Sequence, residues 1–114
     1  DHTAYTMSKY GMSMCVLGMA AEFASDGVAV NGLWPRTVID TVALRMLGGM
    51  VDPKNCRKPD IMADAAHHIL TRDSREYTGQ ILIDEDVLRA AGTTDFSSYA
   101  VDPSESLMPD LFLD

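Results

Sequence analysis

The sequence predicts an α/β fold in which helices cover both faces of a parallel sheet. Residues 28–33 and 81–84 are short apolar runs without the alternation of polar and apolar residues that a strand with one solvated face shows. Each run follows a segment with helical periodicity, at residues 5–24 and 61–72. Helices followed by such strands are typical of a parallel sheet that is buried on both sides.

Residues 5–24 form the most apolar of the predicted helices. Apolar residues lie nearly all round it, so it requires cover on more than one side. We expect the sheet to cover one side and a second copy of the chain another, which gives a homodimer or homotetramer. Four of these residues are methionine, which suits an irregular core or interface better than a metal site. The apolar residues are Met7, Tyr10, Met12, Met14, Val16, Leu17, Met19, Ala20, Ala21 and Phe23.

Turn residues separate the elements that follow this helix. Ser25-Asp26-Gly27 end the helix, and Trp34-Pro35 end the strand at 28–33. The connection at 36–59 is irregular apart from a short predicted helix at 41–47. Long connections of this kind are often functional lids.

The helix at 61–72 contains two neighbouring histidines, and Asp60 is its predicted N-cap. His67 and His68 point about 100° apart on a helix, so they cannot bind one metal ion together as an i, i+4 pair can. We expect them to be surface or packing residues. The sequence predicts no metal site.

The last predicted elements are the strand at 81–84 and a short helix at 85–91. Residues 1–92 therefore form the predicted folded part, and residues 93–114 form an acidic tail. From the end of the strand onward, eight acidic residues accompany a single basic one. The tail ends in Leu111-Phe112-Leu113, so it either docks on the body of the protein or a neighbouring subunit, or frays.

Composition argues against two classes of partner. The chain has 17 acidic and 9 scattered basic residues among 114, which is unsuited to a nucleic-acid surface. It has no run of about 18 apolar residues, so no membrane span is expected. Cys15 and Cys56 form no Cys-x-x-Cys motif and are expected to be free thiols, with one disulfide between them as the alternative. We therefore expect a cytoplasmic protein, or a mitochondrial or peroxisomal one in a eukaryote.

Lys9 lies one helical turn after Tyr5, so both side chains project from the same face of the predicted helix. An ammonium group beside a phenol favours the phenolate and suits the tyrosine to acid–base chemistry. The pair alone is weak evidence, because chance produces roughly one such pair in ten chains of this composition. On their own, the two residues are better explained as polar neighbours on the first turn of an ordinary helix.

Four motifs, taken in order, resemble the C-terminal half of the short-chain dehydrogenase/reductase family, and together they cover nearly all of the chain. They are Tyr5-x-x-x-Lys9, Val30-Asn31-Gly32-Leu33-Trp34-Pro35, Ile39-Asp40-Thr41 and Thr78-Gly79-Gln80-x-x-x-Asp84. Longer strings are similar to one branch of that family. They include Cys56-Arg57-Lys58-x-Asp60-Ile61 and Pro109-Asp110-x-Phe112-Leu113-Asp114.

The resemblance implies a Rossmann-type, doubly wound parallel sheet, of which this chain supplies the last strands and their helices. It implies NADP(H) or NAD(H) as cofactor. It also implies hydride transfer between nicotinamide and the carbonyl or secondary alcohol of a small, lipid-like or acyl-like molecule. Tyr5 would be the acid–base residue, and Lys9 would hold the nicotinamide ribose. The residues that would flank the nicotinamide are Pro35, Thr37, Val38, Ile39 and Thr41, and residues 41–59 would form a substrate lid.

The chain departs from the family pattern just after the first strand. Arg36 follows Pro35 where the family has Pro-Gly, and one extra residue precedes the Ile-x-Thr motif. For this reason Val38 and Ile39 are both candidates for the same cofactor contact.

The chain also lacks what the family carries before the tyrosine: a glycine-rich phosphate loop, an asparagine and a catalytic serine. Ser8 and Ser13 cannot replace that serine, because they lie on the tyrosine's own helix. We therefore expect a fragment without its N-terminal half, which by itself neither binds cofactor nor turns over substrate. One alternative is a non-catalytic relative used for dimerisation or lipid binding. The other is an independent helical module, which would leave a strand edge unpaired.

Overall fold

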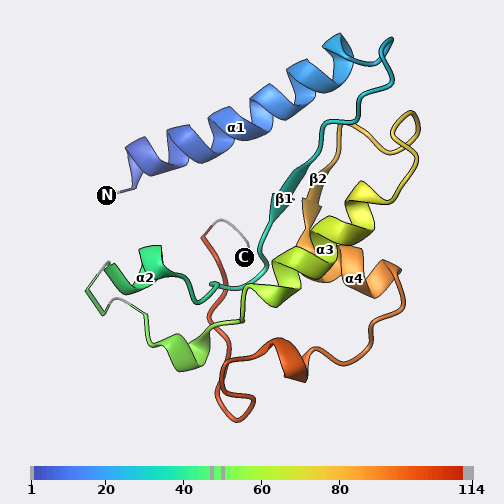
Figure 1. Cartoon of the computed structure of the whole chain (residues 1–114). Helices are drawn as coiled ribbons and strands as arrows, with labels where there is room; N and C mark the ends of the chain where they lie inside the picture. The colour runs from blue at the N-terminus through green and yellow to red at the C-terminus, as the bar shows by residue number, and fades with distance from the viewer. Residues whose placement is uncertain (1, 47, 50, 112–114) are drawn as a thin grey trace.

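The computed structural model describes residues 2–46, 48–49 and 51–111. Its centre is a parallel pair of strands, β1 (Gly32–Trp34) and β2 (Ile81–Ile83), shown in Figure 1. Gly32 is paired with Ile81 and Trp34 with Ile83. Parallel strands need a long crossover between them, and here the crossover contains the helices of the middle of the chain.

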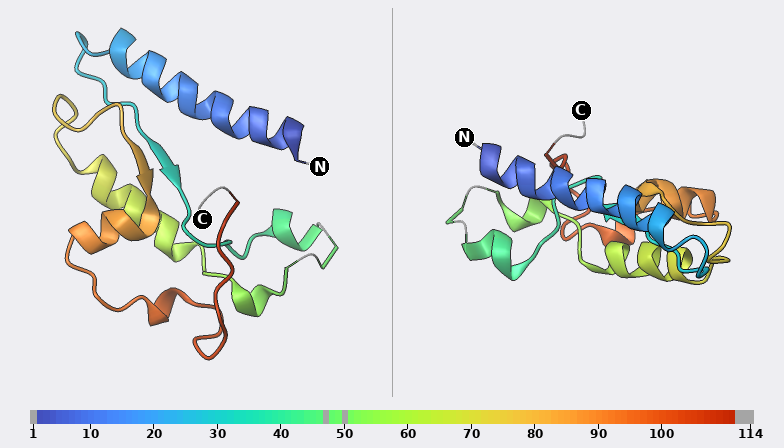
Figure 2. Two further views of the ribbon diagram at one scale, coloured as in Figure 1. Left: turned by 180° about the vertical axis from the view of Figure 1, so that it is seen from behind. Right: turned by 90° about the horizontal axis from the view of Figure 1, so that it is seen from above.

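Helices cover both faces of this sheet. The helix α1 (Thr3–Glu22) runs along one side of the strands, and α3 (Asp60–Leu70) and α4 (Asp84–Ala90) lie on the other, as Figures 1 and 2 show. Side chains alternate between the faces, so Trp34 contacts α1 whereas Leu33 packs on the α3 side. The α/β class with a parallel sheet covered on both faces is confirmed.

Gly32, at the start of β1, lies between Ile81 of β2 and Val16 of α1. A Cβ atom built on Gly32 would lie 3.1 Å from Cδ1 of Ile81 and 3.6 Å from Cγ2 of Val16. Val16 and Ala20 are the buried residues of α1, and both face the strands. The tight contact is thus the one with Ile81, and the glycine at the start of β1 leaves room for the Ile81 side chain of the neighbouring strand.

The hydrophobic core lies on the opposite face, between the sheet, α3 and α4. Ile61 and Ala65 are fully buried and lie four positions apart, so they form one face of α3. Val87 and Leu88 from α4 and Phe96 from the following segment complete the buried cluster. Side chains that pack around this cluster are Leu33, Ile39, Met62, Ile69, Leu82 and Tyr99.

Both strands are shorter than predicted, and their residues are half-buried or, at Ile81, exposed. Just before β1, polar side chains add to the backbone hydrogen bonds between the two segments, among which Gly79 N donates to the Val30 carbonyl (2.8 Å). The Asn31 side chain donates to the Tyr77 carbonyl (2.9 Å) and accepts from the Gln80 backbone N–H (3.0 Å), and Val30 N donates to Thr78 Oγ1 (3.0 Å). These side-chain hydrogen bonds extend the connection between the two segments beyond the three paired residues of each strand.

The predicted helices are present with small shifts in their bounds. The short helix expected at 41–47 is α2 (Val42–Met46), and position 47 lies outside the described residues. The prediction of Asp60 as an N-cap is wrong, because Pro59 occupies that position and Asp60 is already in the first turn. Proline suits a helix start, since its missing N–H is not needed there.

The acidic tail docks on the body of the protein. Val101 N donates to the Cys56 carbonyl (3.0 Å), and Val38 N donates to the Met108 carbonyl (2.9 Å). Two short 3-10 helices, Pro53–Asn55 and Ser97–Tyr99, lie in the segments that meet here. Of the two expectations for the tail, docking is therefore correct as far as Leu111, and positions 112 and 113 lie outside the described residues.

Cys15 is exposed on α1 and Cys56 is buried, and they form no disulfide. Burial raises the pKa of the Cys56 thiol, and the nearby carboxylates of Asp40 and Asp52 act in the same direction. Among the described residues, no helix is both long enough and apolar enough to cross a membrane.

The core predicts a clear contrast between two leucines. Leu88 is 1% exposed and Leu70 is 82% exposed. In the full-length protein we expect Leu88→Ala to lower the free energy of unfolding by about 2–5 kcal/mol, because it leaves a cavity in the core. Leu70→Ala is the matched control and should change it by less than about 0.5 kcal/mol. Urea denaturation of both variants measures the difference, and equal losses would contradict this description of the core.

Candidate active site

The first turns of α1 carry Tyr5 and Lys9 on one face. The Lys9 Nζ atom lies 5.4 Å from the centroid of the Tyr5 ring, which places the ammonium over the aromatic face. Tyr5 is 47% exposed and Lys9 is half-buried. Between them, the Ser8 hydroxyl donates to the Tyr5 carbonyl (2.7 Å), so it bonds to its own helix. The geometry brings a phenol and a cation together and leaves the phenol accessible.

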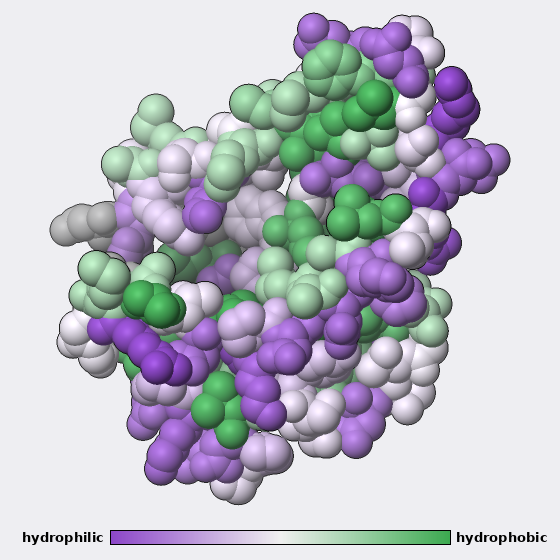
Figure 3. Space-filling view, viewed as in Figure 1, coloured by the Kyte–Doolittle hydropathy of each residue, from purple (hydrophilic) through white to green (hydrophobic). Residues whose placement is uncertain are grey.

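A cavity of about 630 Å³ lies beside this pair, between α1, the end of β1 and the segment that carries α2. Figure 3 shows the surface hollowed between α1 and α2. Most of the lining is apolar. The lining residues are Tyr5, Lys9, Met12, Ser13, Val16, Asn31, Gly32, Leu33, Trp34, Pro35, Val38, Ile39, Thr41, Ala43, Leu44, Asp110 and Leu111.

Six of the seven predicted site residues line this cavity. Tyr5 and Lys9 come from α1, and Pro35, Val38, Ile39 and Thr41 come from the loop after β1. Thr37 does not line it. Its side chain is buried, and its hydroxyl has no hydrogen-bond partner within the described part of the chain. Thr37 is thus buried within the protein and does not form part of the cavity wall.

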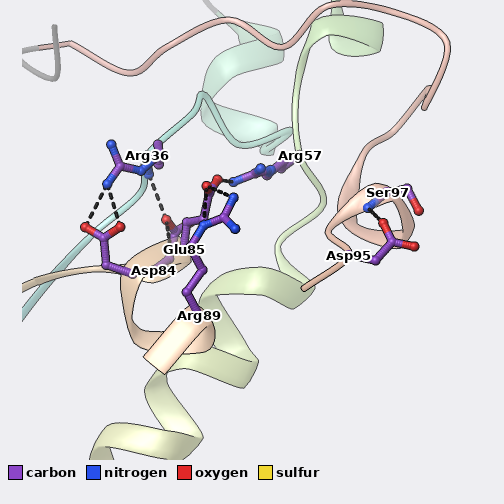
Figure 4. A network of polar contacts seen from close by, with 8 residues as sticks. Arg36, Arg57, Asp84, Glu85, Arg89, Asp95 and Ser97 are labelled. Carbon is purple, nitrogen blue, oxygen red and sulfur yellow. Dashed lines mark hydrogen bonds and ion pairs between the residues drawn. The ribbon is translucent and has the colours of Figure 1, made fainter. Parts of the chain in front are cut away.

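The loop after β1 is held by a buried carboxylate at the start of α4. Asp84 Oδ1 accepts hydrogen bonds from the backbone N–H groups of Arg36 (2.8 Å) and Glu85 (2.6 Å). The Arg36 guanidinium also binds both carboxylate oxygens of Asp86 at 2.7 Å. Figure 4 shows Arg36 above this corner of the structure. The chain therefore leaves β1 in a defined direction, toward the cavity.

Burial raises the pKa of Asp84, while the two N–H groups and the positive charge of Arg57 act in the opposite direction. The side chain is fully buried, and its Oδ2 atom has no hydrogen-bond partner among the described residues. Desolvation penalises the charged carboxylate, and this effect exceeds the stabilisation by the two N–H groups.

A second group of charged side chains packs against the loop after β1. Glu85 lies between Arg57 (2.6 Å) and Arg89 (2.7 Å), and both guanidinium groups lie over the Phe96 ring, as Figure 4 shows for the charged groups. Burial alone would raise the pKa of Glu85, but the contacts with Arg89 and Arg57 lower it below its ordinary value. The Arg57 backbone N–H in turn donates to the Val38 carbonyl (3.0 Å).

The same loop is tied to α2. Asp40 N donates to the Arg57 carbonyl (2.8 Å), and the Asp40 carboxylate binds the Arg45 guanidinium at 2.9 and 2.6 Å. The hydrogen bonds from Arg45 lower the pKa of Asp40. Leu44 of α2 lines the cavity one residue away from this ion pair. The segment expected to be a lid thus forms one wall of the cavity.

No protein-family model matches the chain. It is 57% identical to hydroxysteroid dehydrogenase-like protein 2 of Danio rerio, 55% to that of Rattus norvegicus and 51% to that of Homo sapiens. Each match covers the whole of this chain, and 27%, 21% and 27% of the three relatives respectively. The chain therefore spans about a quarter of the length of the curated relatives it matches.

Two solved structures are also similar. A Xanthomonas campestris protein assigned as a dehydrogenase is 60% identical, with a TM-score of 0.91 over 98% of this chain and 41% of that one. A short-chain dehydrogenase of Mycobacterium thermoresistibile is 46% identical, with a TM-score of 0.85 over 96% of this chain and 39% of that one. The chain belongs to the short-chain dehydrogenase/reductase family.

This assignment confirms the resemblance drawn from the motifs. The branch indicated by the longer strings is that of hydroxysteroid dehydrogenase-like protein 2. The two strands and the helices on both sides of them match part of a Rossmann-type fold of the short-chain dehydrogenase/reductase family.

Several lining residues were not predicted from the short-chain dehydrogenase/reductase motifs. Met12, Ser13 and Val16 lie three, four and seven positions after Lys9, so helical periodicity alone could have placed them on its face. Asp110 and Leu111 carry no such signal. They reach the cavity only because the tail docks beside the loop after β1.

The buried Asp84 predicts a pH-dependent difference in stability. Because its pKa is raised in the folded state, its contribution is most favourable below the unfolded pKa of about 4 and is lost as the pH rises through the folded pKa. Asp84→Asn lacks this titration. We expect the stability of this variant relative to wild type to increase as the pH rises from about 4 toward neutrality.

Urea denaturation of the full-length protein at a series of pH values measures this difference. Asp86→Asn, which alters an exposed carboxylate in the same turn, is the matched control. Parallel stability curves for wild type and Asp84→Asn would contradict the buried, desolvated environment of Asp84.

Proposed function

We propose that the full-length protein is an NAD(P)-dependent oxidoreductase that interconverts a carbonyl group and a secondary alcohol, with Tyr5 as the acid–base residue. One observation carries the proposal: Tyr5 and Lys9 share a cavity with the residues that follow the carboxyl end of β1. Open α/β sheets bind ligands at the carboxyl ends of their strands. The names of the similar proteins, which include hydroxysteroid dehydrogenase-like protein 2 and a short-chain dehydrogenase, support the same class of reaction.

The lining residues suit a nicotinamide nucleotide. Pro35, Val38 and Ile39 offer an apolar surface to a flat ring, and Thr41 adds a hydroxyl at its edge. Lys9 brings three N–H donors that suit the hydroxyl groups of a ribose. NADP(H) and NAD(H) both satisfy these contacts. When bound, the reduced nicotinamide supplies a hydride to the carbonyl carbon.

The chain's own residues would handle the proton. In the direction of reduction, the Tyr5 hydroxyl donates its proton to the carbonyl oxygen as that oxygen gains negative charge. A new O–H bond forms, the C=O π bond breaks, and a tyrosinate remains that the Lys9 ammonium stabilises. The exposed fraction of Tyr5, 47%, gives it access to solvent for reprotonation. Oxidation of the alcohol reverses each step.

The cavity supports an apolar substrate. Met12, Val16 and Leu44 contribute apolar side chains around the acid–base pair. An apolar cavity with few polar groups binds largely apolar small molecules, and its polar groups orient them. A small carbonyl or alcohol compound with a lipid-like or acyl-like part therefore fits best.

Replacing the phenol tests the role of Tyr5. In the full-length protein, Tyr5→Phe should lower kcat by about 10²–10⁴-fold, because it removes the proton donor and keeps the ring. Binding of NADH or NADPH, followed by fluorescence titration, should change little. Tyr10→Phe is the matched control, since Tyr10 lies on the same helix outside the cavity lining and should retain turnover.

Replacing the ammonium separates the two functions of the pair. Lys9→Ala should weaken cofactor binding and also lower kcat, because it removes a ribose contact and the charge beside the phenol. Undiminished turnover in Tyr5→Phe would overturn the assignment of the acid–base residue.

We also propose that α1 pairs two copies of the chain. Its large apolar residues are unusually exposed, with Met7 at 71% and Met14 at 67%, and Figure 3 shows apolar side chains gathered along α1. Exposed apolar surfaces of this kind mark interaction sites. The non-catalytic alternative, a dimerisation or lipid-binding module, would use the same surface. The presence of both Tyr5 and Lys9 in a cavity favours the enzyme.

Light scattering of the full-length protein measures the assembly. We expect the mass of a dimer or tetramer, and a shift toward the monomer in the double variant Met7→Lys and Met14→Lys. A monomeric mass for the wild-type protein would refute pairing through α1.

A further inference from the structure

The tail segment that reaches the cavity, residues 106–111, is held by a series of hydrogen bonds. The Asn55 side chain donates to the Ser106 carbonyl (2.7 Å), and Met108 N donates to the Asn55 carbonyl (2.9 Å). Val38 N donates to the Met108 carbonyl (2.9 Å), and Asp110 N donates to the Arg36 carbonyl (3.1 Å). Asp110 is therefore held directly beside the loop that follows β1.

Asp110 faces the same cavity as Lys9. Both residues line it, and both are half-buried. Burial raises the pKa of the Asp110 carboxyl, while a hydrogen bond from the Leu111 N–H and the positive charge of Lys9 act in the opposite direction. The charge of Lys9 thus reaches the Asp110 carboxylate across the cavity.

These two residues carry the only formal charges among the described residues that line the cavity. Without Asp110, the Lys9 ammonium would be the single charge in an otherwise apolar and neutral wall. A low-dielectric cavity with one uncompensated positive charge attracts anions. The Asp110 carboxylate balances that charge and repels an anionic group on an incoming molecule.

We propose that Asp110 is a specificity-determining residue that makes the cavity select neutral carbonyl and alcohol substrates over those with a carboxylate near the reacting group. This inference rests on the proposed function and deepens it by defining the charge of the substrate. Selection of this kind works by adding a repulsive element against the wrong ligand. The substrate class is thus a neutral, largely apolar ketone or secondary alcohol, such as an ester or amide of a keto acid.

Turnover by the full-length protein tests this selection. Methyl acetoacetate and acetoacetate present the same ketone with a neutral or an anionic neighbour. Wild type should prefer the ester, and Asp110→Asn should raise kcat/KM for the acid by about tenfold or more relative to the ester, because a like-charge contact is lost. Asp110→Glu keeps the charge and should keep the preference. Glu105→Gln alters an exposed carboxylate of the same tail outside the cavity, and it should also keep the preference for the ester.

A binding measurement separates failure of this inference from failure of the proposed function. Calorimetric titration with octanoate and octanamide requires no turnover. Asp110→Asn should bind octanoate about tenfold more tightly than wild type and octanamide equally well. If wild type reduces neither ketone but the variant gains affinity for octanoate, the proposed function fails and the role of Asp110 stands. Two results overturn the role of Asp110. One is that Asp110→Asn and wild type show the same ratio of octanoate to octanamide affinity, and the other is that Asp110→Asn does not bind octanoate at all.

Discussion

The arrangement of the candidate site depends on one buried carboxylate. Asp84 accepts the backbone N–H of Arg36 at 2.8 Å and so joins the end of β1 to the start of α4. The two residues are 48 positions apart, and their contact sets the direction in which the chain leaves the strand. The loop that lines the cavity, the α2 wall and the docked tail all lie downstream of this junction. Because Asp84 is fully buried, breaking these hydrogen bonds would leave the backbone N–H groups of Arg36 and Glu85 without an acceptor, which is costly.

The ion pairs of Glu85 with Arg57 and Arg89 hold the loop after β1 in place and do not line the cavity. Arg57 is 5% exposed and pairs with Glu85, and its backbone forms hydrogen bonds with the loop on both sides. A buried ion pair contributes little net stability compared with an apolar core, but loss of one partner is strongly destabilising. The network therefore specifies where the loop lies. The network lies outside the cavity, where Lys9 and Asp110 are the charged residues of the lining within the described part of the chain.

The two faces of the sheet serve different purposes. On the α3 and α4 side, fully buried residues such as Ile61 and Leu88 form a closed core. On the α1 side only Val16 and Ala20 are buried, and the helix keeps its cavity-facing residues accessible. Stability thus comes mainly from one face, and the acid–base pair occupies the other. A site built on a regular helix has its side-chain directions set by the helix itself, which keeps Tyr5 and Lys9 together.

Local spacing was sufficient to predict α1, its shared Tyr5 and Lys9 face, and the covered parallel sheet, because periodicity along the chain dictates which side chains point the same way. Motif order extended this to the four loop residues Pro35, Val38, Ile39 and Thr41 that line the cavity. Neither motif order nor periodicity could show that Thr37 lies outside the lining. Asp110 beside Lys9, and Asp84 beneath Arg36, were beyond such reasoning. Those contacts join residues far apart in the chain, and they form only when packing closes the long loops between them.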